Sequence, residues 1–503
     1  MLLLYHSVMK SRAAGFSLLA FICLSYASTG IGVTWDEPIW LYGARKIQNF
    51  FVQPEFTKQG ITNLMDGFHH GDDRGFPKIA GAFSLILFEK WVGELTAFRM
   101  ANILLFSMMG GLIYYSIARR FGNEFIALLT ALICFCMPRL TGESMLGDTD
   151  STVATMSLPA VLSAYLGARR RSARWAAVSG LFCGICLASK FIGFVVILTI
   201  LLWTFLYYRR NGIFIYLLVP VITLVIFLIL NPYLWPDPIG RSISFVVRSV
   251  SFYSTEPHFG YYFGKIFRRT PWSFPFVYLV ATNPPVSVIF PVAGLVLVAR
   301  QRFSDPLAGL FALMILFPML MVLLPNSVAF GGARFFLTSF IFFGLMSAWA
   351  LKQWWNSLSK PLLLGGMVVA TILPAIVSHP FELEYYAPQI GGLYGASRLG
   401  MEITYWWDAA NPDFHARANA LLPRDAKVSL FPADHPLLDY YAARNYLNGS
   451  IVPAKESEYM VVLCYPSCEE KRLTTFVRGF YPNPTFLLEY PDEEIPFVLL
   501  LHR

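Results

Sequence analysis

Thr34-Trp35-Asp36-Glu37-Pro38 stands directly after an apolar run at residues 16–33. That run approaches the length of about 20 residues that a helix needs to cross the hydrocarbon core of a bilayer. Two adjacent carboxylates at the point where such a run meets water are costly, so their position indicates a function. We therefore begin from this stretch and expect a membrane protein whose chemistry lies at the end of its first span.

Composition places the whole chain in the membrane class. Of its 503 residues, 56% are hydrophobic and only 14% are charged, which is typical of proteins with many membrane spans. Apolar runs recur from residue 16 to residue 378 and then stop. The net charge of +8 comes from short Lys and Arg clusters between these runs, a pattern that sets topology. We therefore exclude a nucleic-acid partner.

The basic clusters assign the apolar runs to the two sides of the membrane. Lys10 and Arg12 precede the first run, so we expect the amino terminus in the cytoplasm and Asp36 outside. A signal peptide cleaved near Ala27-Ser28-Thr29 is the alternative interpretation of this run. The short apolar segment 79–91 keeps all later clusters in the cytoplasm only if it does not cross. We expect it to be a surface or re-entrant helix.

The sequence then predicts an α-helical membrane protein with about eleven transmembrane helices. They are expected at residues 16–33, 97–117, 125–140, 153–167, 175–189, 191–208, 213–230, 281–298, 306–324, 335–351 and 362–377. Residues 1–378 form the transmembrane domain, with a polar first outer loop at 34–96 and a long outer loop at 231–278. Residues 379–503 alternate helix-like stretches with short apolar runs, which predicts a small α/β domain on the outer face.

The outer loops collect carboxylates together with cations that oppose the usual topological bias. Transfer of a sugar from a phospholipid to a hydroxyl needs a base for the acceptor proton and cations for the leaving phosphate. The catalytic candidates are Asp36, Glu37 and Asp150. The candidate phosphate ligands are Lys190, Arg268, Arg269 and Arg334. Secondary candidates are Asp148, Glu143 and His258.

Most of these groups also have a plainer interpretation. Asp36 is placed to cap the end of the first span. Asp148 or Asp150 is placed to cap a helix that starts near Ser151. Lys190 can extend from a helix end toward the interface, and the two arginines of the long loop can contact anionic lipid.

Neither histidine nor cysteine residues predict a firm metal site. The stretch His69-His70-Gly71-Asp72-Asp73 has no recognised ligand spacing and fits a solvated loop. Five of the seven cysteines lie in apolar runs, where we interpret them as buried hydrophobic residues. Cys464 and Cys468 lie in the soluble part and would pair in an oxidising compartment. No cofactor is certain from the sequence, and a divalent metal stays an open alternative.

The ordered motifs resemble the GT-C superfamily of membrane glycosyltransferases, in particular the protein O-mannosyltransferase-like family 39 and the aminoarabinose transferases. Thr34-Trp35-Asp36-Glu37-Pro38 is similar to the first-loop acidic motif, whose Asp is the expected base, and Asp150 lines up with a second-loop Asp. Asn231-Pro232-Tyr233-Leu234-Trp235 is similar to the start of the long outer loop. Phe330-Gly331-Gly332-Ala333-Arg334-Phe335-Phe336 keeps the Arg of a Tyr-Asp-Gly-x-Arg-His pattern but has Phe335 in place of the His.

The resemblance implies an inverting transferase that moves a mannose-like sugar from a polyprenyl-phosphate donor to a hydroxyl acceptor. The acceptor would be a protein, lipid or glycan, and the site would face the periplasm or another exoplasmic space of a bacterial inner or plasma membrane. A transporter or flippase is the alternative, but transporters usually place ionisable groups near mid-membrane within repeats. A receptor-like protein that binds a partner through residues 379–503 is the other, although eleven spans exceed what anchoring needs.

Overall fold

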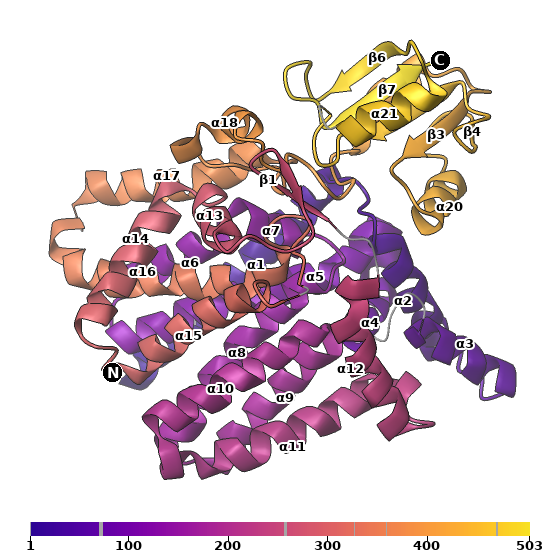
Figure 1. The fold of residues 1–503 in the computed structure, drawn as a ribbon. Coiled ribbons are helices and arrows are strands. Elements are labelled where there is room, and N and C mark those ends of the chain that lie inside the picture. Colours follow the sequence, from indigo (N-terminus) through magenta and orange to yellow (C-terminus); the bar gives the residue numbers. More distant parts are fainter. Residues whose placement is uncertain (1, 70–73, 256–258, 326, 359, 469–470) are drawn as a thin grey trace.

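A helical body and a small sheet domain make up the protein (Figure 1). The computed structural model describes all residues except 1, 70–73, 256–258, 326, 359 and 469–470. The chain starts at one end of the helical body, and the sheet domain lies at the opposite end. This arrangement confirms the predicted fold class, an α-helical membrane body with a small C-terminal α/β domain.

Each predicted span is a helix in the structure. The helices are α1 (Leu2–Ala27), α5 (Glu94–Phe121), α6 (Glu124–Phe135) continued by α7 (Pro138–Ser144), α8 (Asp150–Arg170), α9 (Ala173–Ser189), α10 (Phe194–Tyr207), α11 (Ile213–Leu230), α14 (Pro285–Arg300), α15 (Pro306–Met321), α16 (Leu337–Leu358) and α17 (Pro361–Ser378). Among the described residues, six helices are long and apolar enough to cross a membrane, and the pair α6–α7, bent by 72°, can count as a seventh. The others, α9, α10, α14 and α15, are shorter apolar helices.

The helices differ in how deeply they lie in the body. In α16 and α8, 89% and 83% of the apolar segment is buried, whereas in α17 the share is only 6%. Gly180 and Gly184 of α9 lie against α11, where an added Cβ would meet Ile222 at 2.8 Å and Ile226 at 2.6 Å. Small residues allow helices in membranes to approach closely in this way. The central helices therefore form a fixed frame, and the outer ones face lipid.

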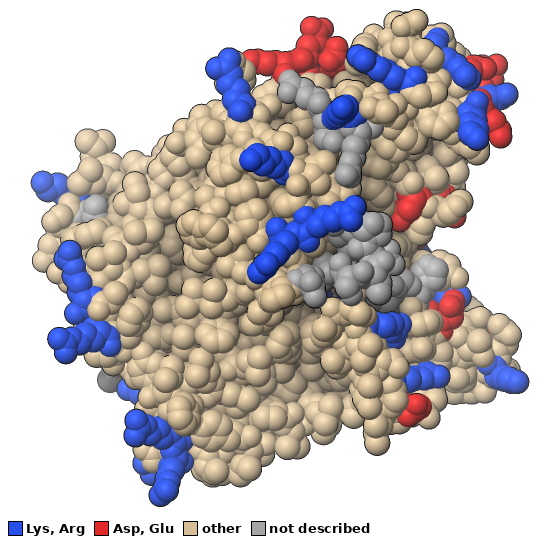
Figure 2. Space-filling model, viewed as in Figure 1, with Lys and Arg blue, Asp and Glu red and all other residues tan. Residues whose placement is uncertain are grey.

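The surface charge differs between the two ends of the molecule. Figure 2 shows Lys and Arg without visible Asp or Glu at the end of the body near the amino terminus, then a largely uncharged band. Side chains of both signs appear around the sheet domain at the other end. Basic residues concentrate on the cytoplasmic side of membrane proteins, so the sheet domain is expected on the opposite side.

The first outer loop is largely helical. The helix expected at residues 79–91 is present, and two further helices lie in the stretch that the sequence predicted as a polar loop. The loop contains α2 (Glu37–Val52), α3 (Lys58–His69) and α4 (Gly75–Val92). Pro38 lies in the first turn of α2, a position where proline is favoured. α2 buries Trp40, Ala44 and Ile47, so tertiary packing contributes to the stability of this helix.

The long outer loop also has regular structure. α12 (Pro238–Thr255) is followed by a two-stranded antiparallel hairpin of β1 (Gly260–Tyr262) and β2 (Lys265–Phe267), and then by α13 (Phe274–Ala281). The hairpin and α13 pack through Tyr262, whose ring centroid lies 5.4 Å from that of Phe274. The loop is therefore a folded layer over the ends of the helices.

The C-terminal domain is a five-stranded mixed sheet with helices. Its strand order is β4-β3-β5-β7-β6, built from β3 (Lys427–Phe431), β4 (Ser450–Ile451), β5 (Tyr459–Leu463), β6 (Thr485–Tyr490) and β7 (Val498–His502). β3 is parallel to β4 and β5, while β7 is antiparallel to β5 and β6. The helices are α19 (Pro412–Leu421), α20 (His435–Arg444) and α21 (Lys471–Phe480). A disulfide joins Cys464 to Cys468.

The segment between α17 and the sheet domain ties both parts of the chain to the first loop. The Gly32 N–H donates to the Asp408 carbonyl at 2.8 Å, and the Trp35 N–H donates to the Trp406 carbonyl at 3.2 Å. An ion pair between Arg444 of α20 and Glu94 of α5 adds a second connection. The stretch that carries Asp36 is therefore held between the helical body and the C-terminal domain.

Candidate active site

Asp36 lies at the start of α2 beside a cation from a distant part of the chain. Its Oδ2 is 3.7 Å from Nη1 of Arg334, the first residue of the short 3₁₀ helix η5 (Arg334–Phe336). The Asp36 side chain is 32% exposed, whereas that of Arg334 is only 10% exposed. The carboxylate is thus open to an incoming molecule while its cationic partner is held in the protein.

Aromatic rings surround the Arg334 guanidinium. Its central carbon lies 4.9 Å from the centroid of Phe330, 5.1 Å from Phe335 and 4.8 Å from Trp406. Aromatic faces stabilise a cation without neutralising its charge. The buried Nε of Arg334 has no hydrogen-bond partner among the described residues. Arg334 therefore keeps donor capacity for a further anion.

A second ion pair also lies close to Phe335. Lys190 follows α9, and its Nζ is 2.6 and 2.7 Å from the two carboxylate oxygens of Asp150. The same Nζ lies 4.8 Å from the Phe335 ring centroid. Burial lowers the pKa of Lys190, the charge of Asp150 opposes this, and nearby Arg74 and Arg334 lower it further. Phe335, which stands where the resembling family has His, is thus in contact with two cations.

Arg74 is a third cation that sequence reasoning did not select. It precedes α4, its Nη1 donates to Thr149 Oγ1 at 3.1 Å, and its guanidinium lies 5.9 Å from the Trp40 ring. Thr149 is the residue before Asp150. In the sequence it was one charge in a polar loop, and no signal distinguished it.

Glu37 is structural, which corrects its place among the catalytic candidates. Its buried carboxylate pairs with Arg99, with Oε1 2.7 Å from Nε and Oε2 2.7 Å from Nη2. It also accepts from the N–H groups of Thr34 at 2.9 Å and Gly147 at 2.8 Å. Burial raises the pKa of Glu37, but Arg99 and these donors outweigh it and lower the pKa overall. Glu37 therefore fixes the backbone around Asp36.

The remaining carboxylate candidates also serve as supports. Asp148 accepts from the N–H groups of Asp150 at 3.1 Å and Ser151 at 3.3 Å, so it caps the start of α8. Glu143, which is 1% exposed, accepts from the Tyr405 hydroxyl at 2.8 Å. Of the two Asp residues expected near this helix start, Asp148 is the cap and Asp150 reaches Lys190.

Two predicted phosphate ligands lie apart from this group. Arg268 and Arg269 follow β2 and are exposed. In the described part of the chain, neither contacts Asp36, Asp150 or Lys190. The basic character of the loop was visible in sequence, but the contacts of its arginines were not. His258 lies outside the described residues.

Buried carboxyls in the connecting segment support the loop that carries Arg334. Glu402 Oε2 accepts from the Gly332 N–H at 2.8 Å. Gly331 and Gly332 both have positive φ, at 68° and 66°, and a Cβ on Gly332 would come within 2.5 Å of Arg139 Nη1. Glycine is needed here both for its conformation and for the close approach. The two glycines and Glu402 thus direct Arg334 toward Asp36.

The buried carboxyls of Glu384 and Glu402 make stability depend on pH. Burial raises the pKa of each to about 7, from an ordinary value of 4.5. The folded protein then keeps protons that the unfolded chain loses, so its stability is highest below pH 4.5 and falls as pH rises through 7. We expect the melting temperature to fall over this window and Glu402→Gln to weaken the fall. Exposed Glu456→Gln is the control, and an unchanged pH profile in Glu402→Gln contradicts the assignment.

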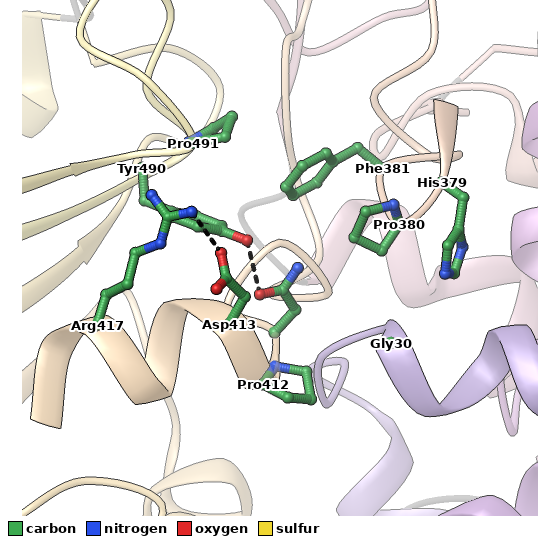
Figure 3. A pocket seen from close by; sticks show the side chains of 10 residues that line it. Gly30, His379, Pro380, Phe381, Pro412, Asp413, Arg417, Tyr490 and Pro491 are labelled. Atoms are coloured by element: carbon green, nitrogen blue, oxygen red, sulfur yellow. Dashed lines mark hydrogen bonds and ion pairs between the residues drawn. The ribbon is translucent and has the colours of Figure 1, made fainter. Parts of the chain in front are cut away.

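A separate cavity lies where the end of α1 meets the C-terminal domain. It has a volume of about 460 Å³, and its walls include Gly30, His379, Phe381 and Tyr490 (Figure 3). Figure 3 shows Arg417 paired with Asp413 beside the Tyr490 ring. None of Asp36, Asp150, Lys190 and Arg334 lines it. Among the described residues, no three His, Cys, Asp or Glu side chains are grouped to hold a metal ion.

Known proteins resemble the chain mainly in fold. A family model described as dolichyl-phosphate-mannose-protein mannosyltransferase matches residues 80–235, whereas no curated protein sequence matches. The structure is similar to ArnT from Cupriavidus metallidurans in the apo state, with TM-score 0.54 and 14% identity over 97% of this chain and 98% of that one. ArnT bound to undecaprenyl phosphate gives TM-score 0.52 and 12% identity over 97% of each chain.

A third solved structure extends the likeness. It is the archaeal oligosaccharyltransferase AglB from Archaeoglobus fulgidus, in complex with an inhibitory peptide and a dolichol-phosphate. Its TM-score is 0.51 at 14% identity, over 92% of this chain and 69% of that one. The chain is therefore a multi-pass helical membrane protein with the GT-C fold. The match to the mannosyltransferase family model covers residues 80–235, which is less than a third of the chain.

Proposed function

We propose that the protein is an inverting glycosyltransferase that moves a mannose-like sugar from a polyprenyl phosphate to a hydroxyl acceptor on the exoplasmic face. The observation that carries this proposal is the partly exposed Asp36 carboxylate beside Arg334, with Lys190 and Arg334 both in contact with the Phe335 ring. The family model and the ArnT and AglB structures with bound lipid phosphates support a lipid-phosphate donor. The acceptor is a protein, lipid or glycan.

Asp36 is the base of the proposed reaction. It takes the acceptor hydroxyl proton as the oxygen attacks the anomeric carbon, and the bond from that carbon to the phosphate oxygen breaks in the same displacement. The electron pair leaves with the phosphate, and one displacement inverts the anomeric carbon. At 32% exposure, the Asp36 side chain is reachable from water by an acceptor.

Arg334 and Lys190 bind the leaving phosphate as its charge grows. Arg334 has an unpartnered Nε and only a loose contact of 3.7 Å to Asp36. It can therefore bind a phosphate without losing a strong ion pair. Lys190 has three N–H donors, of which Asp150 occupies two. Asp150 therefore orients the Lys190 ammonium, and Arg74 adds positive charge nearby. Cations fixed where charge develops stabilise a transition state.

Product analysis tests this function. Purified protein is given a panel of polyprenyl-phosphate sugars and extracted acceptors, and the products are analysed by mass spectrometry. We expect the acceptor to gain the mass of one sugar residue and polyprenyl phosphate to be released in equal amount. Uptake of labelled substrate into sealed vesicles without a covalent product would instead establish the transporter alternative.

Lys190→Gln should reduce transfer by about 10²- to 10³-fold, because it removes one charge from the phosphate site. Steady-state kinetics with the lipid-linked donor measures the loss. Lys265→Gln changes an exposed basic residue of β2 in the long outer loop and serves as the matched control. Equal kinetics for the two variants would remove Lys190 from the site.

A further inference from the structure

α12 carries an apolar stripe that no part of the described structure covers. Ile239, Ile243, Val246, Val247 and Val250 are 76%, 59%, 46%, 57% and 64% exposed. Their spacing of four, seven, eight and eleven residues from Ile239 places them on one face of a helix. A contiguous apolar face of this kind in water marks an interaction surface.

The opposite face of α12 is cationic. Arg241 and Arg248 are seven residues apart, about half a turn around the helix from the stripe. The Arg241 guanidinium lies 4.4 Å from the Tyr233 ring and donates to the Tyr233 carbonyl. A helix with an apolar face and arginines on the opposite face is typical of helices that lie in the membrane interface.

The position of α12 in the chain puts it at the surface of the bilayer. It follows α11, an apolar helix long enough to span, after a short turn. Trp235 in that turn is 55% exposed, and its indole donates to the Leu228 carbonyl of α11 at 2.8 Å. Exposed tryptophan is enriched at membrane interfaces. Figure 1 shows α12 at the end of the helical body away from the amino terminus.

We propose that α12 lies in the plane of the outer bilayer interface, with its apolar stripe in the acyl region and its arginines at the level of anionic lipid headgroups. Its partner is thus the lipid surface itself. A protein partner is a less suitable occupant, because α12 follows α11 after a short turn, and only 22% of the apolar segment of α11 is buried in the protein.

The interfacial position of α12 would also fix the depth of Lys190 relative to the bilayer surface. Phe245, on the buried side of α12, is 8% exposed, and its ring centroid lies 5.9 Å from Phe191 and 5.3 Å from Phe227. Phe191 directly follows Lys190. A helix fixed at the headgroup level therefore holds the Lys190 turn where the phosphate of a lipid-linked donor lies. This part of the inference rests on the proposed function.

Fluorescence quenching by lipid tests the interfacial position of α12 without any activity assay. In full-length protein reconstituted into vesicles with anionic lipid, Cys23→Ser removes the one exposed free cysteine of the described residues. An environment-sensitive dye is then attached at Val247→Cys or, as the control, at Arg248→Cys on the exposed side opposite the stripe. We expect acyl-chain quenchers to quench the dye at position 247 several-fold more strongly. Equal quenching at both positions would contradict the proposed interfacial position of α12.

Kinetics tests the coupling to Lys190. Ile243→Asp/Val247→Asp should raise the KM for a long-chain polyprenyl-phosphate sugar about tenfold, because charge is costly in the acyl region. The KM for a short-chain, water-soluble donor should not change, and Lys265→Asp, at an exposed position outside α12, should change neither KM. Equal effects on both donors, or none, would overturn the coupling. If the wild type transfers no sugar, the proposed function fails, while the quenching result still decides whether α12 lies in the bilayer interface.

Discussion

Asp36→Asn is expected to reduce sugar transfer by about 10²- to 10⁴-fold, because the amide cannot take the proton of the acceptor hydroxyl. The substitution keeps the size and shape of the side chain. In the structure the Asp36 carboxylate makes one ion pair, at 3.7 Å to Arg334, so its loss should leave the fold intact. Turnover of a lipid-linked sugar, together with the melting temperature of the variant, measures both effects.

Asp66→Asn is a matched control for this substitution. Asp66 lies on α3 in the same outer loop, is 44% exposed and pairs with Lys46 at the surface. An exposed ion pair contributes at most about 1 kcal/mol, so this variant should fold and turn over normally. If Asp36→Asn also kept near-normal turnover, Asp36 would not be the base.

Arg99→Met is expected to lower the free energy of unfolding by about 3–5 kcal/mol, since it leaves the buried Glu37 carboxylate without its cation. Arg99 also donates to the carbonyls of Ser28 at 2.8 Å, Ile31 at 3.0 Å and Gly32 at 2.5 Å. These bonds close the stretch that leads to Asp36. Denaturant-induced unfolding of the protein in detergent measures this loss of stability.

Two further variants separate this ion pair from general surface effects. Arg12→Gln removes an exposed ion pair with Glu124 and should cost at most about 1 kcal/mol. Arg99→Met/Glu37→Gln removes both buried charges and should recover part of the stability lost in Arg99→Met. If Arg99→Met were no less stable than Arg12→Gln, the pair would not hold the Asp36 stretch in place.

The helical body could be predicted because a bilayer imposes long apolar runs, and basic clusters identify their cytoplasmic ends. In the first outer loop, the helix at 79–91 was predicted from its apolar run, but α2 and α3 were not. In α2, charged and amide residues interrupt the apolar ones, so its buried face depends on packing that the sequence does not display. The same limit applies to Arg268 and Arg269, since charge is visible in a sequence but the contacts of a side chain are not.

The site was partly predictable. Asp36, Asp150, Lys190 and Arg334 were selected from four separate stretches, and the structure brings them together around Phe335. The neighbours Asp36 and Glu37 could not be told apart, because their difference depends on Arg99, which lies in the helix of a predicted span. Arg74 was missed for a similar reason: its neighbours Thr149 and Lys190 are distant in sequence.

Accessibility of position 36 tests the central claim of an outer-surface transfer site most directly. In sealed right-side-out vesicles, protein carrying Cys23→Ser and Asp36→Cys is treated with a membrane-impermeant thiol reagent. Because the Asp36 side chain is 32% exposed, we predict labelling in intact vesicles, with slower labelling when a polyprenyl-phosphate sugar is present. Labelling only after the vesicles are opened would place the carboxylate on the cytoplasmic side and contradict the account.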